Sequence, residues 1–430
     1  MNNFHLINNK MNETFLEFKL NFKTLNFYKK IFYIYFLLGP LIYLIERDPA
    51  DLWLSSVVII FLVRSFKTND WKWIKTKWFK FAFYFWIFAL ISSLISEKPV
   101  YSFSQGFVWF RFPIFAIACQ TWILKDELVR KIFLYMIGLA FILMCIILSL
   151  ELILEPLNSY NLPKDRLSWP YGDLVPGSFL AKSCLPFFIT CLYFLYSSKN
   201  KLSFCVFFIL ISLHLTFTYL TGERINFIIL FSTLILFTLL ITKDLKRILK
   251  IFSLFLIVIT ITSIISPTSL ERYTNSFLNR IPILNFSETN TYWGAWRTGI
   301  HQGIKNPFFG VGPSGTRYMC KKLENDPVKW LPGKNFCGNH PHNFYLQLFG
   351  ETGLFGLILG TLMIFNIIKG SIVSNNMYKI KNLSHCYFLI PIALFFPISQ
   401  HGSFFGQWGN LFIWIAIAYA LANNQNLSQK

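Results

Sequence analysis

Twelve apolar runs, separated by charged residues or by clusters of Pro and Gly, constrain the fold of this chain more than any other feature. A helix that crosses a bilayer needs about 20 mostly apolar residues. The runs therefore predict an all-α polytopic membrane protein with about 12 transmembrane helices. Because 54% of the 430 residues are hydrophobic, such spans use nearly all the apolar content, which excludes a water-soluble enzyme. The runs lie near residues 31–45, 52–63, 79–96, 103–124, 132–154, 178–197, 202–221, 225–242, 248–266, 342–368, 385–400 and 408–424.

The runs divide the chain into four parts. A cytoplasmic N-terminal segment, 1–30, precedes transmembrane helices 1–9 in residues 31–266. One large periplasmic loop, 267–341, separates helix 9 from helix 10, and residues 342–430 hold helices 10–12 and a cytoplasmic tail. The first 30 residues are too polar for a cleavable signal peptide, and no small-residue cleavage site follows the first run. We expect the chain to be inserted whole, and the short run at 52–63 is the weakest predicted span.

The charge distribution predicts the orientation. The chain has 40 Lys and Arg against 20 Asp and Glu, a net charge of +20. If both termini are cytoplasmic, 24 of the 40 basic residues fall on the inside, whereas the short outside connections are acidic or neutral. Positive charge in short loops favours the cytoplasmic side. We therefore expect both termini in the cytoplasm and the 267–341 loop on the outer face.

Further cations lie on the outer side, in the long loop and at the outer ends of spans. Ionisable groups at membrane depth often mark a pathway or a site, and several cations together could hold an anion such as a lipid phosphate. The alternative is that long basic side chains reach up to the lipid headgroups, and for Lys182 both interpretations stay open. The residues are Arg272, Arg280, Arg297, Lys305, Arg317, Lys321, Lys322, Lys329 and Lys334 in the loop, and Arg111, Lys182 and Arg224 in the spans.

Glycines in the long loop spell a nucleotide-binding pattern that we reject. Gly310, Gly312 and Gly315 match G-x-G-x-x-G. That pattern binds dinucleotides only between a strand and a helix of a βαβ unit. No strand pattern precedes these glycines, and Pro313 interrupts them. The sequence predicts a turn that leads into a short helix.

A cluster of polar residues stands at the start of the tenth span. His340, His342 and Asn343 precede Leu346 and Gly353, which recur at helical spacing. His342 is therefore expected to begin a helix whose first turn opens to the outside. The positive end of the helix dipole discourages an extra proton on an imidazole, so a neutral histidine there is ready to accept one. The alternative is an interfacial histidine that hydrogen-bonds lipid headgroups.

These residues resemble a known family. His342-Asn343, followed after nine residues by Gly353 and after two more by Gly356, resembles the His-[Asn/Ser/Gln]-x9-Gly-x2-[Gly/Thr/Tyr] pattern of the O-antigen ligase and polymerase superfamily. Upstream, NPFFGVGPSGTRYMC and CGNHPHNFYLQLFGETG are similar to that family's periplasmic-loop signature, and TGER is similar to its arginine-bearing segment. The resemblance covers roughly residues 215–365 by motif.

The resemblance implies a metal-independent membrane glycosyltransferase without a cofactor. Such an enzyme takes a glycan from an undecaprenyl-pyrophosphate carrier on the periplasmic face of the bacterial inner membrane. The family's general base falls on His342 and one phosphate-binding arginine on Arg224; His340 and Asn343 would support them. A second family arginine stands where this chain has Tyr292. The other candidate pyrophosphate ligands are Arg297, Arg280, Arg317 and Arg111.

The chemistry of these residue types agrees with the resemblance. Displacing a sugar from pyrophosphate requires that charge on the leaving oxygens be stabilised, which the rigid fork of arginine donors does well. Activating a sugar hydroxyl requires a base that is neutral near pH 7. We expect the glycan-bearing carrier, a glycan or lipid A-core acceptor and membrane lipids as partners, and no nucleic acid. A polymerase or a protein-glycosylating relative stays open, as does a transporter or flippase, which would show internal repeats and broken helices.

Two of the eight cysteines share the long outer loop. Cys320 and Cys337 lie 17 positions apart, and an oxidising compartment favours a disulfide between them, worth roughly 3 kcal/mol by chain entropy. The alternative is a zinc site formed by these cysteines with His340 and His342. A metal there would consume the proposed base, so we predict the disulfide and no metal.

Two other polar residues lie within predicted spans. His214 is expected to make a hydrogen bond between helices. Glu351 follows His342 by nine residues, about two and a half helical turns. It should therefore point to roughly the opposite face and not orient the imidazole.

Overall fold

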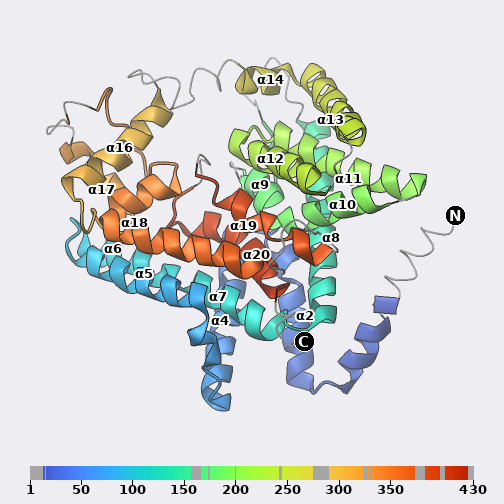
Figure 1. Ribbon diagram of the computed structural model, residues 1–430, viewed down its shortest axis with the longest axis horizontal. Coiled ribbons are helices and arrows are strands. Elements are labelled where there is room, and N and C mark those ends of the chain that lie inside the picture. The colour runs from blue at the N-terminus through green and yellow to red at the C-terminus, as the bar shows by residue number, and fades with distance from the viewer. Residues whose placement is uncertain are drawn as a thin grey trace.

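The structure, a computed structural model, describes most of the chain as packed helices. The prediction of an all-helical protein is confirmed for this part of the chain, in which no strand occurs (Figure 1). The described residues are 13–14, 16–155, 166–172, 175–198, 200–241, 245–274, 290–323, 328, 331–372, 383–397 and 402–424.

Within the described part of the chain, seven helices are long and apolar enough to cross a membrane. An eighth span is bent by 56° between Pro176–Ser183 and α10 (Leu185–Ser197). The chain is therefore a multi-pass membrane protein. The seven are α4 (Arg47–Thr68), α5 (Lys77–Leu94), the continuous stretch Pro99–Ile123 that contains α6 (Pro99–Trp109) and α7 (Arg111–Ala118), α8 (Glu127–Leu154), α11 (Lys201–Leu220), α12 (Arg224–Ile241) and α18 (Phe344–Ser371).

The predicted spans differ from these helices in two ways. The short run at 52–63 lies within α4, which has 22 residues because its polar flanks continue the helix. The first run instead breaks into α2 (Phe27–Leu37) and α3 (Gly39–Ile42), where Pro40 lacks a backbone N–H to donate. The number of 12 spans thus stays a prediction. Three further predicted runs correspond to helices with shorter apolar segments. These helices are α13 (Leu245–Ile265), α19 (Leu389–Leu394) and α20 (Gln407–Ala422).

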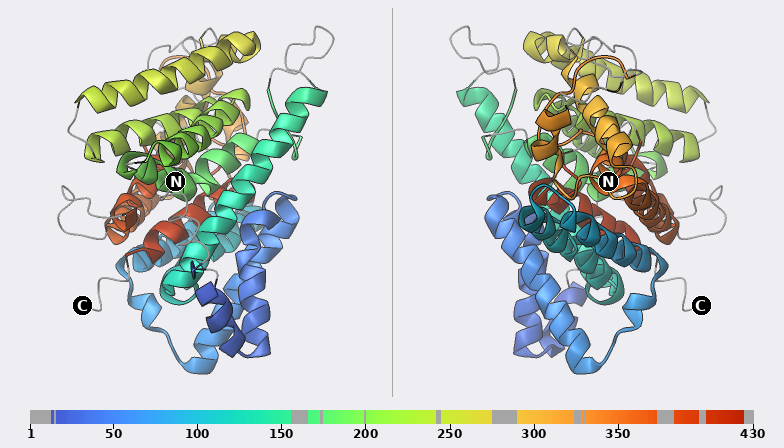
Figure 2. Two further views of the ribbon diagram at one scale, coloured as in Figure 1. Left: turned by 90° about the vertical axis from the view of Figure 1, so that its right-hand side faces the viewer. Right: turned by 90° about the vertical axis from the view of Figure 1, so that its left-hand side faces the viewer.

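One of these shorter helices is central. In α20 every residue from Asn410 to Ala422 is buried, and the helix packs against α7, α4, α18 and α19. Figure 2 shows α8 running diagonally across one side of the molecule, between the N-terminal helices and the group formed by α11, α12 and α13. Protein surrounds α20, so its 16 residues need not match the thickness of a bilayer on their own.

The long loop predicted at residues 267–341 contains helices of its own. They are α14 (Pro267–Tyr273), α16 (Thr291–Lys305) and α17 (Thr316–Leu323). Asn290 caps α16, with its side-chain oxygen accepting from the N–H groups of Tyr292 and Trp293. The prediction that the glycine-rich turn leads into a short helix is confirmed, because α17 follows Gly315 directly. Figure 1 shows α16 and α17 together at one end of the molecule, beside the first part of α18.

The helix that follows the histidines is kinked. Gly353 has φ 65° and ψ −167°, so α18 consists of two helical parts, 344–352 and 354–371. The preceding loop takes up the backbone groups that the kink releases. The N–H groups of Val311 and Gly312 donate to the carbonyls of Gly350 (3.0 Å) and Glu351 (2.8 Å), respectively. A break inside a membrane helix is tolerated when neighbouring backbone satisfies these groups.

The loop meets this helix at very short range. The N–H of Leu354 donates to the carbonyl of Pro307 (2.7 Å). A Cβ on Gly310 would lie 2.3 Å from the backbone carbon of Glu351, and a Cβ on Gly353 would lie 2.4 Å from that of Phe308. Only glycine permits this approach. We call the contact between residues 307–316 and 350–354 the kink junction.

Candidate functional site

The candidate site begins at the turn that precedes α18. Asn343 caps the helix: its Oδ1 accepts from the N–H groups of Tyr345 (3.0 Å) and Leu346 (3.1 Å). Its Nδ2 donates to the carbonyl of Pro397 (2.7 Å). The helix therefore starts at Phe344, and the expectation that His342 begins it is wrong by two residues. The physical reason is the strong preference of Asn for the cap position.

His342 lies just outside the capped helix, in an uncommon backbone conformation. Its φ of 57° falls in the left-handed region, which a non-glycine residue adopts rarely. The turn brings His342 close to His340, with ring centroids 4.3 Å apart. The edge of one ring faces the other in the pair formed by His342 and Tyr292, whose centroids are 6.1 Å apart. The two imidazoles and the phenol thus form one cluster.

Arg224 joins this cluster through the same tyrosine. It is the first residue of α12, after the turn at Gly222. Its Nη2 donates to the Tyr292 hydroxyl (3.0 Å), and its guanidinium carbon lies 5.5 Å from the centre of the Tyr292 ring. Tyr292 therefore contacts both Arg224 and His342, which are 118 positions apart in the chain. One phenol thus contacts a guanidinium, which can bind an anion, and an imidazole, which can accept a proton.

Sequence reasoning missed Tyr292 as a site residue. The available signal was that it occupies the position where the resembled family has a second arginine. The structure makes Tyr292 the link between α12 and the histidine turn, because α16 packs against α18. Gly299 of α16 allows this packing, since a Cβ there would lie 2.9 Å from Pro341, the residue between the two histidines.

A buried polar network includes Glu223, the residue before Arg224, and Lys182 of the bent span. The Lys182 side chain is only 3% exposed, which excludes a position among the lipid headgroups. Its Nζ donates to Ser178 Oγ (3.2 Å), and that hydroxyl donates to Glu223 Oε2 (3.1 Å). Asn226 Nδ2 also donates to Ser178 Oγ (3.2 Å). The bent span and the start of α12 are joined by these bonds.

Arg297 of α16 contacts residues 331–335 and not the cluster of Arg224, Tyr292 and His342. Its Nε donates to the carbonyl of Pro332 (3.1 Å), its Nη2 to that of Leu331 (3.2 Å), and its Nη1 to Asn335 Oδ1. Burial lowers the pKa of the Arg297 guanidinium from its ordinary value, but arginine keeps its charge near neutral pH. Arg297 thus holds residues 331–335 against α16.

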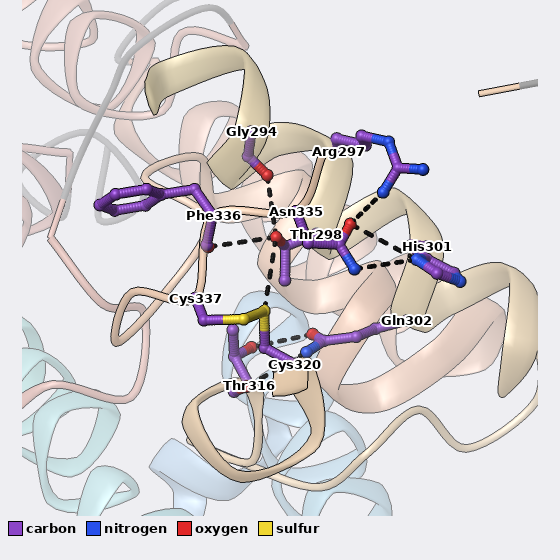
Figure 3. The surroundings of a disulfide bond; sticks show 10 residues. All are labelled: Gly294, Arg297, Thr298, His301, Gln302, Thr316, Cys320, Asn335, Phe336 and Cys337. Atoms are coloured by element: carbon purple, nitrogen blue, oxygen red, sulfur yellow. Dashed lines mark hydrogen bonds between the residues drawn. A yellow bond between two sulfur atoms is a disulfide. The ribbon is translucent and has the colours of Figure 1, made fainter. Parts of the chain in front are cut away.

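A disulfide adds a covalent link in the same region. Cys320 of α17 is bonded to Cys337, with Cα atoms 5.4 Å apart. Figure 3 shows Thr298 beside this bond; its hydroxyl oxygen lies 2.8 Å from the carbonyl oxygen of Gly294 and 3.2 Å from that of Phe336. Figure 3 also shows Asn335 between Arg297 and His301, with Asn335 Nδ2 3.0 Å from His301 Nδ1. Because both sulfurs are in the disulfide, neither can serve as a thiolate ligand for zinc.

We call this set of contacts the disulfide region. It comprises Arg297, Thr298 and His301 of α16, residues 331–338, and the Cys320–Cys337 bond. It ends two residues before His340, so it fixes the chain on the N-terminal side of the histidine turn.

Two other candidate arginines, Arg111 and Arg317, contact neither Arg224 nor His342 among the described residues. Arg111 forms an ion pair with Asp51 of α4 and also donates to Ser55 Oγ (3.0 Å). It also donates to Gln407 Oε1 (2.7 Å), so it links α7 to α4 and α20. Arg317 lies over the ring of Tyr101 at 5.6 Å. Arg280 lies outside the described residues.

The two remaining polar residues are both buried in helices. The prediction for His214 is confirmed, since its Nε2 lies 2.9 Å from the carbonyl oxygen of Leu180 on a neighbouring helix. Glu351 makes no described contact with the imidazole of His342. Its carboxyl group instead contacts Ser314, Thr316 and Gln347, a connection that helical periodicity alone could not indicate.

Comparison with known proteins supports the resemblance. Residues 187–360 match the family model described as O-antigen ligase. The matched segment begins in α10, includes Arg224 and Tyr292, and ends in α18 beyond His342. The comparison with curated proteins gives no match. The predicted resemblance is confirmed over this segment: residues 187–360 of this multi-pass membrane protein are similar to the O-antigen ligase family.

Proposed function

We propose that the protein is an inner-membrane glycosyltransferase that moves a glycan from an undecaprenyl-pyrophosphate carrier to a lipid A-core or similar acceptor on the periplasmic face. Both termini are cytoplasmic in this proposal. The observation that carries it is the contact of Tyr292 with both Arg224 and His342. This contact lies within the segment that matches the O-antigen ligase family.

The proposed reaction is a direct displacement. The imidazole of His342 accepts the proton of an acceptor hydroxyl, whose oxygen forms a bond to the anomeric carbon of the glycan. The bond between that carbon and the pyrophosphate breaks, and the carrier leaves as its pyrophosphate. Arg224 stabilises the charge that develops on the leaving oxygens. The imidazolium then releases its proton to water, which returns the base to its neutral form.

The other residues of the cluster hold these two groups in place. Tyr292 keeps the guanidinium of Arg224 near the histidine turn, and Asn343 fixes the backbone that carries His342. His340 supports the imidazole of His342 by ring contact at 4.3 Å. Precise placement of this kind is what makes a bound donor and acceptor react rapidly.

Substitution of the proposed base tests the assignment. His342→Ala should lower glycan transfer by about 10²- to 10⁴-fold, the usual contribution of a general base, while the protein still inserts into the membrane. His385→Ala is the control, because His385 lies at a short helical turn, Leu383–Cys386, that precedes α19. Wild-type transfer by His342→Ala would overturn the proposal.

The acceptor is identified by deletion of the gene in its native host. A gel of the lipopolysaccharide that lacks the whole glycan ladder indicates a ligase. A single repeat left on the core indicates the alternative, a polymerase of the same superfamily. An unchanged gel contradicts a role in lipopolysaccharide synthesis. The alternative is then a transporter or flippase, which the bent span with buried Lys182 would favour.

A further inference from the structure

The kink junction encloses a carboxyl group that the proposed reaction does not use. Glu351 is fully buried in the first part of α18. Its Oε2 accepts from the N–H of Ser314 (2.9 Å) and from Nε2 of Gln347 (2.8 Å). Its Oε1 lies 2.8 Å from the hydroxyl oxygen of Thr316. Among the described residues, no Lys, Arg or His lies within ion-pair distance of this carboxyl group. A buried charge without such a partner is costly.

The neighbouring amides have fixed orientations. Gln302 Nε2 donates to the carbonyl of Thr316 (3.2 Å), so Gln302 Oε1 is the atom that faces the Thr316 hydroxyl at 3.0 Å. Gln347 Oε1 accepts from the N–H of Phe404 (2.7 Å), so its Nε2 must be the group that faces Glu351. Neither amide can be turned over without placing two donors or two acceptors together.

Counting protons then shows that an ionised Glu351 leaves this network one proton short. The Thr316 hydroxyl has one hydrogen, yet its oxygen lies within hydrogen-bond distance of two acceptor atoms, Gln302 Oε1 and Glu351 Oε1. If Glu351 is ionised, one of these two contacts joins oxygen lone pairs with no hydrogen between them. If Glu351 is protonated, its hydroxyl donates to Thr316 and Thr316 donates to Gln302. Every polar atom then has a partner, as buried networks require.

We propose that Glu351 is a protonated, neutral carboxylic acid and acts as the positioning residue that holds the first part of α18, which His342 precedes. It connects the loop at Ser314 and Thr316 to Gln347, one helical turn after Asn343. Gln347 in turn bonds Ser403 (2.9 Å) and Phe404, near the start of α20. This inference rests on the proposed function, because the geometry it maintains is that of the proposed base.

Replacement of Glu351 by its neutral isostere tests the proposal. In Glu351→Gln, the new amide can donate to Thr316 and accept from Ser314, so transfer should stay within about threefold of wild type with an unchanged pH profile. Glu351→Ala leaves several donors without partners and should lose at least about tenfold in transfer, since each lost bond costs a large part of a tenfold step. Equal loss in both variants would overturn the proposal.

Two further measurements keep the test decisive if a variant folds poorly. The infrared spectrum of the purified wild-type protein should contain the carbonyl band of a protonated carboxylic acid that Glu351→Gln lacks. An unchanged spectrum would overturn the proposal.

The Thr316 hydroxyl gives a second test. Thr316→Ser should keep glycan transfer, whereas Thr316→Val, which removes the hydroxyl, should lose part of it. Equal transfer by the two variants would contradict the proposed network.

His342→Ala in the same assay separates the two proposals. If His342→Ala transfers glycan at the wild-type rate, the proposed function fails. The infrared spectrum still tests whether Glu351 is protonated, whatever the function. If His342→Ala is inactive while Glu351→Gln is as impaired as Glu351→Ala, the function is supported and the role of Glu351 is refuted.

Discussion

The chain is fixed on both sides of the histidine turn, but by different physics. Before the turn, the disulfide region uses a covalent bond and the charged donors of Arg297. After it, the kink junction uses backbone hydrogen bonds, glycine contacts and the uncharged partners of Glu351. The first belongs to the loop between α13 and α18, whereas the second includes part of a candidate span, α18. A helix at membrane depth must have its released backbone groups satisfied internally, and the junction does this.

Because the disulfide region and the kink junction are held by different contacts, they should tolerate different substitutions. In the disulfide region the contacts are separate bonds to loop carbonyls and side chains, so each can be removed with a limited loss. In the kink junction two backbones meet with no room for a Cβ at Gly310 or Gly353. One added methyl group there must move a helix or a loop, and packed interiors resist such shifts.

The largest expected effect is therefore at the kink. Gly353→Ala should destabilise the protein by about 4 kcal/mol, from roughly 2 kcal/mol of backbone strain at φ 65° and roughly 2 kcal/mol of overpacking against Phe308. Thermal unfolding in detergent, followed by tryptophan fluorescence, measures this loss. Gly409→Ala in α20 is the matched control, because a Cβ there meets nothing within 4 Å. Similar unfolding midpoints for the two variants would remove the distinction between the regions.

The sequence predicted the disulfide far better than the kink junction. Two cysteines in one loop that is predicted to lie outside indicate their own pairing, because an oxidising compartment favours a disulfide. Gly353 also stands in the family pattern, but its φ is decided by backbone hydrogen bonds to the loop at 307–312, about 40 positions upstream. Helical periodicity therefore predicted a continuous helix through it. Tertiary contacts of this kind override local preference.

The residues of the candidate site also differ in how well the sequence predicted them. His342 and Arg224 could be proposed from motifs, because imidazole and guanidinium carry their chemistry in the residue type. Tyr292 was missed: its place at a family arginine position marks it, but the residue type does not indicate that it contacts both Arg224 and His342. Arg297 was one of several candidate phosphate ligands, and only the positions of Leu331 and Pro332 show that its donors face loop carbonyls.

Removal of the disulfide is the next largest expected effect. Cys320→Ser together with Cys337→Ser should cost roughly 3 kcal/mol, because the unfolded chain regains the entropy of the closed loop. The variant should also unfold at the same temperature with and without reductant, while the wild type becomes less stable in reductant. Cys205→Ser is the control, because Cys205 is free and exposed. A wild-type midpoint that ignores reductant would contradict the contribution of this bond to stability.

The smallest expected effect concerns single polar contacts of the disulfide region. Asn335→Ala removes the acceptor of Arg297 Nη1 and the partner of His301, and should cost about 1.5 kcal/mol, as for other hydrogen bonds to charged groups. Arg297→Ala should cost more, because it also releases the carbonyls of residues 331 and 332.

The double variant decides what Arg297 does. If its guanidinium acts by holding residues 331–335, the losses from Arg297→Ala and Asn335→Ala overlap, and the double variant is less destabilised than their sum by about 1 kcal/mol. Glycan transfer should then fall in parallel with stability in all three variants. If Arg297 instead binds the pyrophosphate, Arg297→Ala would abolish transfer, whereas Asn335→Ala, at comparable stability, would leave it nearly intact. That outcome would move Arg297 from the disulfide region into the site beside Arg224.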